Sequence, residues 1–298
     1  MRRAVLAASS TVAAAALVTG VLSASALAHG STPTAAAQAA ARYVALGDSY
    51  TSAPFVPQQT GKPAGCLRSS HDYPALVAAA THPAGFTDVS CQGATTANMT
   101  QSEGVVLGTN SPQFSALGPT DTLVTVQIGG NDIAVADVFL ICAGLSFLDP
   151  FGSPCKEHYT SGGTDRLARS TAQTAPKVAA VLRGIHARAP QARVLLAGYP
   201  DILPSTGHGC WPRVPIAFGD VPYLRGVETR FNTMLATVAA ANRTTFVNTY
   251  ADSIGHDVCQ SASVRWIEDV IPTSAAAPIH PNAHGEQAMA RQVLAALH

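Results

Sequence analysis

Three short segments contain the residue types that nucleophilic catalysis requires. Ser49 lies in Gly47-Asp48-Ser49, Asn131 follows two glycines, and His280 precedes a proline. A serine nucleophile needs a base that takes its proton and hydrogen-bond donors that stabilise the developing oxyanion. Ser49, His280 and Asn131 supply these three chemical types, and the chain has no G-x-S-x-G segment that would offer a competing serine.

Each segment alone also has an ordinary structural explanation. Gly-Asp-Ser is a common turn sequence, Asn131 or Asp132 is suited to cap a helix, and His280 could lie in a surface loop. His280 and His284 are four residues apart, but the chain has no H-E-x-x-H segment and no obvious third metal ligand. We therefore expect no metal ion and no cofactor.

The elements that must position these residues form an alternating pattern. Short apolar runs predict strands at 43–46, 86–90, 122–128, 193–197 and 244–248. Helical patterns cover 73–80, 165–189, 221–241 and 282–297. This alternation predicts an α/β fold with a mostly parallel sheet covered on both faces, and such sheets bind ligands at the carboxyl ends of their strands. The three candidate segments all lie at that edge.

Long segments rich in Gly and Pro connect some of these elements. They are 51–70, 143–163 and 198–220, which we predict as loops. Apolar residues in three places, 54–57, 139–141 and 147–148, could line an acyl pocket, although the core is the better expectation for any one of them. No linker-like break interrupts the chain after residue 41, so one domain is expected over 42–298.

The amino terminus has the features of a secretory signal peptide. Arg2 and Arg3 precede an apolar stretch over 4–22, and Ala26 and Ala28 form an A-x-A cleavage pattern. An uncleaved membrane anchor is the alternative, but the apolar stretch is short and contains serines. We predict a signal peptide over 1–28, a flexible leader over 29–41, and a secreted, extracellular protein with no transmembrane anchor after processing.

Composition limits the classes of partner. Charged residues make up 12% of the chain, and removal of residues 1–28 leaves a net charge of about −2 with histidines neutral. No basic patch is evident, so we expect no nucleic-acid partner. The low charge fits a compact secreted protein, which we expect to be a monomer.

All six cysteines lie after the predicted cleavage site. An even number in an exported chain favours disulfides, and zinc is the weaker alternative because no C-x-x-C pair is present. Six cysteines allow 15 connectivities. We expect sequential pairing, because each link then closes one loop region: Cys66–Cys91, Cys142–Cys155 and Cys210–Cys259.

Taken together, four segments in order resemble the GDSL, or SGNH, hydrolase family, and most closely its secreted actinobacterial (Streptomyces-type) esterases and lipases. The four are Gly47-Asp48-Ser49, the segment around Gly93, Gly129-Gly130-Asn131-Asp132, and His280-Pro281. The resemblance covers the chain from Tyr43 to its last helix. It implies a flavodoxin-like three-layer α/β/α fold with a five-stranded parallel sheet.

The resemblance also implies roles. Ser49 would attack an ester carbonyl with His280 as general base, and the oxyanion would be held by the backbone N–H groups of Ser49 and Gly93 and the side-chain amide of Asn131. Asp48 would brace the turn. The family's usual Asp three residues before the His is replaced by Ala277. We therefore expect a Ser–His pair in which a backbone carbonyl, that of Ala277 or Pro278, orients His280.

Asp252, Asp257 and Asp269 are the alternative carboxylate partners for His280, but none of them has the family spacing.

Two classes of function remain open. The preferred function is a serine esterase or lipase acting on a small-molecule or lipid ester, with an acetyl esterase acting on polysaccharide as a close alternative. A non-catalytic secreted binding module of the same fold is the second class.

Overall fold

The centre of the molecule is a five-stranded, fully parallel sheet. The computed structural model describes residues 41–298. The predicted signal peptide over 1–28 and, apart from Ala41, the predicted leader over 29–41 lie outside these residues. The strands of the sheet, in spatial order, are β4 (Gly85–Asp88), β1 (Arg42–Gly47), β7 (Leu123–Gln127), β8 (Arg193–Ala197) and β9 (Thr245–Val247). This order confirms the flavodoxin-like fold expected from the resemblance.

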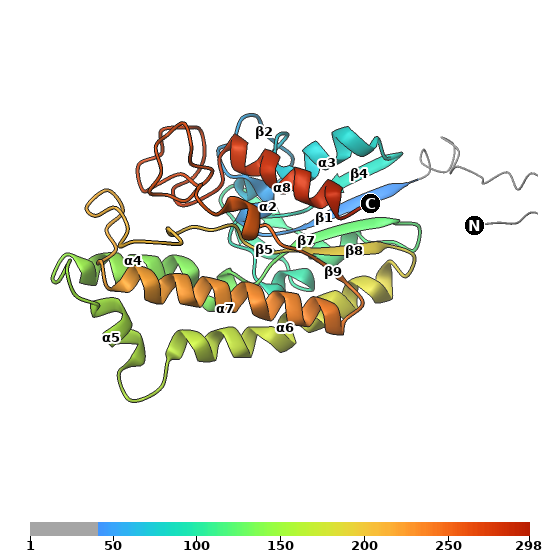
Figure 1. Ribbon diagram of the computed structural model, residues 1–298. Coiled ribbons are helices and arrows are strands. Elements are labelled where there is room, and N and C mark those ends of the chain that lie inside the picture. The colour runs from blue at the N-terminus through green and yellow to red at the C-terminus, as the bar shows by residue number, and fades with distance from the viewer. Residues whose placement is uncertain (1–40) are drawn as a thin grey trace, which may run out of the picture.

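Helices cover both faces of the sheet (Figure 1). On one face lie α3 (Tyr73–Thr81) and α8 (Ala283–Ala295), and on the other lie α6 (Arg166–Arg188) and α7 (Asp220–Ala241). Strand β1 illustrates why both faces are closed. Tyr43 and Ala45 pack with the α3 and α8 side, while Val44 and Leu46 pack with the α6 and α7 side. A strand that is apolar on both faces must be buried on both.

The remaining elements are short. They are α2 (Ser49–Ser52), α4 (Val135–Ser146), α5 (Pro154–Thr160), the strand pair β2 (Gln59–Thr60) and β3 (Arg68–Ser69), and the hairpin β5 (Glu103–Val105) and β6 (Gly108–Asn110). Single 3₁₀ turns lie at Ala64–Cys66, Thr96–Met99, Gln113–Ala116, Asn131–Ile133 and Ala251–Ser253. Among residues 41–298, no helix is both long and apolar enough to cross a bilayer.

The prediction of a loop over 143–163 is wrong, because this stretch contains the end of α4 and all of α5. Helix α5 has no capping side chain of its own. Instead, the buried carboxylate of Asp220 accepts the N–H groups of Cys155 at 2.9 Å and Lys156 at 2.8 Å. Asp220, expected just ahead of α7, is the first residue of that helix and caps a different one. A cap supplied from 65 residues away leaves no local sequence signal.

Three disulfides join segments around the sheet. They pair Cys66 with Cys91, Cys142 with Cys155, and Cys210 with Cys259, and none of the six cysteines is free. The first ties the loop after β4 to the turn before β3, the second ties α4 to α5, and the third ties the loop after β8 to the loop before α8. These are the sequential pairs.

Candidate active site

Ser49 lies at the carboxyl end of β1, where a tight turn leads into α2. A Cβ atom on Gly47 would lie 2.1 Å from Thr51 Oγ1 and 2.8 Å from the Gln127 carbonyl, so only glycine fits there. Asp48 is the N-cap of α2, since its carboxylate accepts the N–H of Tyr50 at 3.0 Å. From Tyr43 to Pro54 every residue except Ser49 is buried. The turn therefore presents a single side chain to solvent.

The structure brings Ser49 and His280 together across 231 residues of sequence. Ser49 Oγ lies 2.8 Å from His280 Nε2, and His280 Nδ1 lies 2.7 Å from the carbonyl oxygen of Pro278. A carbonyl only accepts, so Nδ1 carries the hydrogen and Nε2 presents its lone pair to the serine hydroxyl. Burial lowers the pKa of His280 below 6.5, although the Pro278 carbonyl opposes this shift. The imidazole is therefore neutral at pH 7.

Of the two carbonyls expected to orient His280, that of Pro278 contacts the ring and that of Ala277 does not. The Ala277 carbonyl oxygen accepts the main-chain N–H of His280 at 3.2 Å, and the Ala277 N–H donates to the Pro54 carbonyl at 2.9 Å. The Ala277 carbonyl is thus committed to the turn itself, and the next carbonyl, that of Pro278, faces the ring. Within residues 41–298 no carboxylate, including those of Asp252, Asp257 and Asp269, hydrogen-bonds to the His280 side chain.

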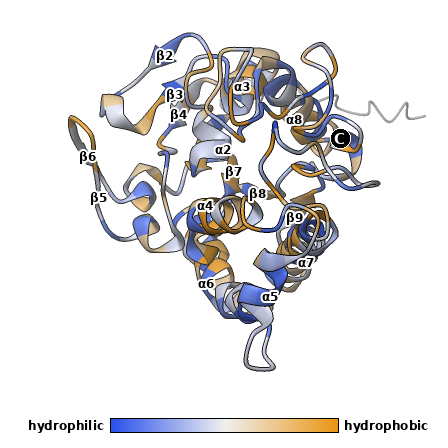
Figure 2. Ribbon diagram, turned by 90° about the vertical axis from the view of Figure 1, so that its left-hand side faces the viewer, coloured by the Kyte–Doolittle hydropathy of each residue, from blue (hydrophilic) through white to orange (hydrophobic). Residues whose placement is uncertain are grey.

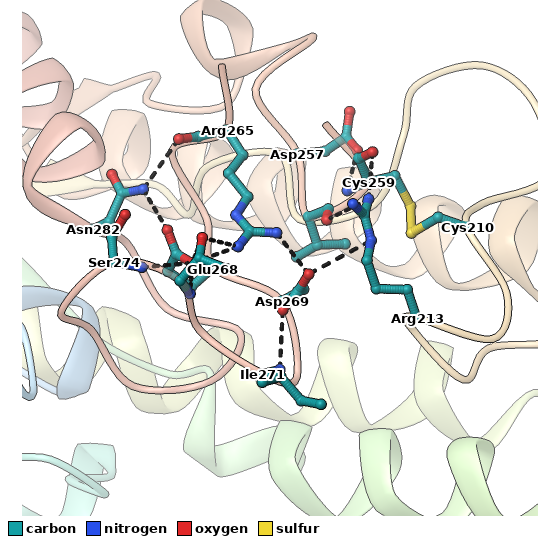
Figure 3. A network of polar contacts seen from close by, with 12 residues as sticks. Cys210, Arg213, Asp257, Cys259, Arg265, Glu268, Asp269, Ile271, Ser274 and Asn282 are labelled. Carbon is teal, nitrogen blue, oxygen red and sulfur yellow. Dashed lines mark hydrogen bonds and ion pairs between the residues drawn. A yellow bond between two sulfur atoms is a disulfide. The ribbon is translucent and has the colours of Figure 1, made fainter. Parts of the chain in front are cut away.

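The loop that carries His280 rests on a buried charged network (Figure 3). Glu268 pairs with this loop through its main chain, because its N–H donates to the His280 carbonyl at 2.9 Å and its carbonyl accepts the Ile279 N–H at 3.1 Å. The Glu268 carboxylate accepts from Arg265 at 2.8 Å and from Asn282 at 2.8 Å. Arg265 also binds Asp269 at 2.6 Å. Sequence reasoning missed this network, apart from naming Asp269 for another role.

Tyr50 connects the two sides of the site. Its hydroxyl donates to the Ile279 carbonyl at 2.7 Å, and its ring centre lies 5.0 Å from that of the His280 imidazole. Ile279 has φ +59°, a left-handed conformation that a β-branched residue adopts only under constraint. The contacts of Tyr50 and Glu268 provide that constraint on both sides of the peptide.

Three hydrogen-bond donors near Ser49 have no acceptor among the described residues. They are the backbone N–H of Ser49, the backbone N–H of Gly93, and one hydrogen of the Asn131 side-chain amide, whose other hydrogen donates to the Ala94 carbonyl at 2.9 Å. The Asn131–Ala94 contact fixes the amide beside the Gly93 segment. The N–H of Cys91 donates to the Gly47 carbonyl at 3.1 Å, which fixes the same segment beside the Ser49 turn. Free donors of this kind suit a developing oxyanion.

The buried carboxylates of Asp48 and Asp132 link the segments that carry Ser49, Gly93 and Asn131. The Asp48 carboxylate accepts the Tyr199 hydroxyl, whose oxygen accepts the Gly130 N–H at 3.0 Å. Burial raises the pKa of Asp48 to about 7. Asp132 accepts the Thr96 N–H at 2.8 Å and the Thr96 hydroxyl at 2.6 Å. Asp132 thus joins the Asn131 and Gly93 segments instead of capping a helix. Nothing in the sequence around Tyr199 indicates its role.

The described residues contain no cluster of His, Cys, Asp and Glu side chains suited to holding a metal ion. His284 lies in the first turn of α8, where its main-chain N–H donates to the Asn282 side chain at 3.0 Å. His280 and His284 therefore belong to different structural features, a loop and a helix start.

Comparison with known proteins decides the family. The model of the GDSL-like Lipase/Acylhydrolase family matches residues 45–288. The chain belongs to this family. Lipase 2 of Streptomyces coelicolor is 38% identical over 257 residues, covering 85% of this chain and 84% of the relative. Lipase 1 of the same organism is 30% identical over 272 residues, covering 89% and 91%. The GDSL-family protein described here is a carboxylic ester hydrolase.

Solved structures of two Streptomyces enzymes share its architecture. Phospholipase A1 from Streptomyces albidoflavus NA297 superimposes with a TM-score of 0.70 at 28% identity, covering 86% of this chain and 98% of that one. The extracellular lipase from Streptomyces rimosus gives a TM-score of 0.68 at 26% identity, covering 87% and 100%. The α/β/α architecture therefore extends over nearly the whole length of both enzymes.

Proposed function

We propose that this protein is a secreted hydrolase of lipid acyl esters, with Ser49 as nucleophile and His280 as general base. The observation that supports this most directly is the 2.8 Å contact between Ser49 Oγ and His280 Nε2, made by a neutral imidazole. An unprotonated base already hydrogen-bonded to the hydroxyl is what serine activation requires.

In the acylation step, Ser49 Oγ attacks the ester carbonyl carbon as His280 Nε2 takes its proton. The carbonyl oxygen becomes an oxyanion, which accepts the N–H groups of Ser49 and Gly93 and the free amide hydrogen of Asn131. Collapse of this intermediate breaks the carbon–oxygen bond of the ester. His280 gives its proton to the departing alcohol, and the acyl group remains on Ser49.

Deacylation reverses these roles with water. His280 takes a proton from water, hydroxide attacks the acyl carbonyl, and the same three donors hold the second oxyanion. The proton returns to Ser49 as the carboxylic acid leaves. The Pro278 carbonyl keeps Nδ1 protonated throughout and stabilises the transient imidazolium, which a main-chain dipole does less strongly than a carboxylate.

Substrate class and export rest on the relatives. The names of the similar proteins describe lipases and a phospholipase A1, and one describes an extracellular lipase. Long-chain acyl esters of lipids are therefore the proposed substrates. We propose export directed by residues 1–28, which is checked by the mass of the protein from the culture medium, expected to begin at residue 29.

Hydrolysis of p-nitrophenyl esters tests the proposed residues. Ser49→Ala and His280→Ala are expected to abolish measurable turnover, while Ser263→Ala and His82→Ala, on the surface, keep it. Asn131→Ala is expected to lower kcat by about 10²–10³-fold, as for other single oxyanion donors. Equal rates for the wild type and Ser49→Ala would exclude the proposed nucleophile.

A panel of esters tests the substrate class. Long-chain glycerides and phospholipids are expected to give higher kcat/KM than acetyl esters of sugars or polysaccharides. A preference for acetylated polysaccharide at equal concentration would contradict the lipid assignment and leave the proposed chemistry of Ser49 intact.

A further inference from the structure

Helix α4 and the segment after it expose large apolar side chains. The α4 surface consists of residues whose side chains are 40–82% exposed: Leu140, Ile141, Phe147, Leu148 and Phe151. The sequence suggested that residues of this stretch would lie in the core or line a pocket, and for Leu140, Phe147 and Leu148 the expectation of a core position is wrong. Soluble monomers rarely expose a contiguous apolar patch of this kind without a partner.

The orientation of α4 is fixed by its opposite face. There the residues are small, namely Cys142, Ala143 and Ser146, and all are buried. Cys142 is bonded to Cys155 of α5, and Ser146 Oγ donates to the Cys142 carbonyl at 2.7 Å and accepts the Ala217 N–H at 2.8 Å. Covalent and polar contacts thus hold the small face inward, and the helix cannot roll its leucines into the core.

Aromatic neighbours extend the surface beyond the helix. The ring centre of Phe147 lies 5.1 Å from that of Trp211, and the ring centre of Phe151 lies 5.5 Å from that of Phe218. Each pair joins the α4 region to the loop between β8 and α7. Of these four residues, Trp211 is of the type that is enriched at membrane interfaces, because its ring is apolar and its N–H is polar.

The helix that carries this surface begins beside the candidate active site. The turn Asn131–Ile133 leads directly into α4, so the exposed helix begins within one turn of Asn131. Figure 2 views the molecule from this side and shows α4 below α2, the helix that starts at Ser49. A large apolar object resting on α4 therefore lies on the same side of the molecule as Ser49.

The charge of this region restricts which partner can bind to the α4 surface. From Ile133 to Ser153 the chain contains two acids, Asp137 and Asp149, and no Lys or Arg. Both acids are exposed. Anionic membranes attract polybasic segments and repel acidic ones. The surface thus complements an apolar partner that carries no net negative charge.

We propose that the α4 surface adsorbs to uncharged or zwitterionic lipid–water interfaces and holds Ser49 against the aggregated lipid. Leu140, Leu148 and Phe151 insert among the acyl chains at the boundary, as the apolar face of an interfacial helix does. The role of this adsorption in turnover rests on the proposed function, whereas adsorption itself does not require catalysis.

Flotation with lipid vesicles tests adsorption without turnover. The full-length mature protein carrying Ser49→Ala is mixed with phosphatidylcholine vesicles, and bound protein is measured. The pair Leu140→Ser and Leu148→Ser is expected to reduce partitioning by at least about tenfold, because burial of one leucine contributes roughly that factor. The matched control is Leu107→Ser in the turn of the β5–β6 hairpin, where the leucine is 86% exposed. It is expected to leave partitioning unchanged.

Three results would overturn the proposal. The first is equal binding by the pair variant and its parent, and the second is binding that requires anionic phosphatidylglycerol. The third is a dimer in sedimentation that the pair substitution dissociates in the absence of lipid, which would make a second copy of the chain the occupant of the surface.

Turnover gives an independent readout in protein that retains Ser49. The pair variant is expected to hydrolyse soluble p-nitrophenyl acetate at the parental rate and an emulsified long-chain ester at least about tenfold more slowly. Equal losses on both substrates would contradict an interfacial role. If no ester is hydrolysed by any form, the proposed function fails while the flotation result still decides the question of adsorption.

Discussion

The two halves of the candidate site are held in place by opposite means. On the Ser49 side, a glycine turn at the end of a central strand is enclosed by buried, largely uncharged contacts, and burial raises the pKa of the Asp48 carboxyl in that turn to about 7. On the His280 side, an irregular loop lies on the ion pairs of Arg265 with Glu268 and Asp269. Burial raises the pKa of Glu268, but hydrogen bonds from Asn282, Thr273 and Arg265 together lower it.

The difference follows from what each residue is attached to. The position of Ser49 is fixed by β1, which is hydrogen-bonded to strands on both sides. His280 lies in a segment without strand or helix, residues 254–282, whose polar backbone groups must find hydrogen-bond partners elsewhere. Charge provides them: the Glu268 carboxylate accepts the N–H groups of Thr273 at 2.8 Å and Ser274 at 3.3 Å. A sheet positions the nucleophile, and an ionic network positions its base.

The largest expected effect is on the His280 side. Glu268→Ala leaves Arg265 buried and partly unpaired, which typically costs about 3–5 kcal/mol of unfolding free energy. Urea denaturation measures this loss, with the exposed Glu157→Ala as control. At temperatures where the variant stays folded, kcat is expected to fall while KM changes little, because the loop carries the base and not the substrate. An unchanged kcat in folded protein would show that the network supports the fold alone.

The second prediction concerns the pH dependence of stability. Because the pKa of Asp48 is raised in the folded state, its favourable contribution to the free energy of unfolding is fully present below about pH 3.8. This contribution is lost as the pH rises toward 7. Asp48→Asn removes this dependence, so its stability relative to the wild type should rise by about 2–3 kcal/mol between pH 5 and pH 8. Thermal or urea unfolding at several pH values measures it. A constant difference across this range would contradict a raised pKa.

Glu268 should show the opposite sign. Its pKa is lowered in the folded protein, so its contribution is present above about 4.5 and is lost as pH falls through the lower folded value. The loss of unfolding free energy in Glu268→Gln, relative to the wild type, should therefore be smallest at the most acidic pH at which the protein stays folded. The same trend for Glu268→Gln and Asp48→Asn would remove the contrast between the two sides.

Tyr50→Phe tests the contact between the sides. Without its hydroxyl, the Ile279 carbonyl loses a 2.7 Å hydrogen bond, and the loop that carries His280 gains freedom. We expect about 1 kcal/mol of lost stability and a fall in kcat of roughly 5- to 10-fold. Tyr159→Phe on α5 is the control. A fall in kcat/KM that comes from KM alone would indicate substrate contact instead.

The smallest effect is a shift in a pH–rate profile. Because no carboxylate accompanies His280, the acid limb of kcat/KM is expected to have its midpoint below pH 6.5. Ala277→Asp restores the family position and should move that midpoint to higher pH, since a nearby negative charge favours the imidazolium. Identical profiles would show that the new carboxylate does not reach the ring.

Strands, long helices and the residue types at the strand ends were predictable, because each depends on local periodicity or on a short motif. The N-cap role of Asp72 at α3 follows from its neighbours alone, and the structure has it, with Ala75 N–H at 2.8 Å. What failed depends on contacts that no local pattern reveals. The turn uses the Ala277 carbonyl and leaves that of Pro278 for the ring. No sequence pattern indicates that Arg265 is buried. Helix α4 was missed because several of its large apolar residues, Leu140 and Ile141 among them, face outward, which reverses the usual rule.

The carboxylate of Asp220 makes the formation of α5 depend on the docking of α7. A seven-residue helix such as α5 is too short to persist alone in water. Its first N–H groups find their acceptor only when α7 has docked, and Cys155, which lies in that same first turn, then stands opposite Cys142. Docking of α7 is therefore expected to precede stable closure of this bond. A chain that lacks the Asp220 carboxylate should expose α5 to proteases while the sheet remains intact.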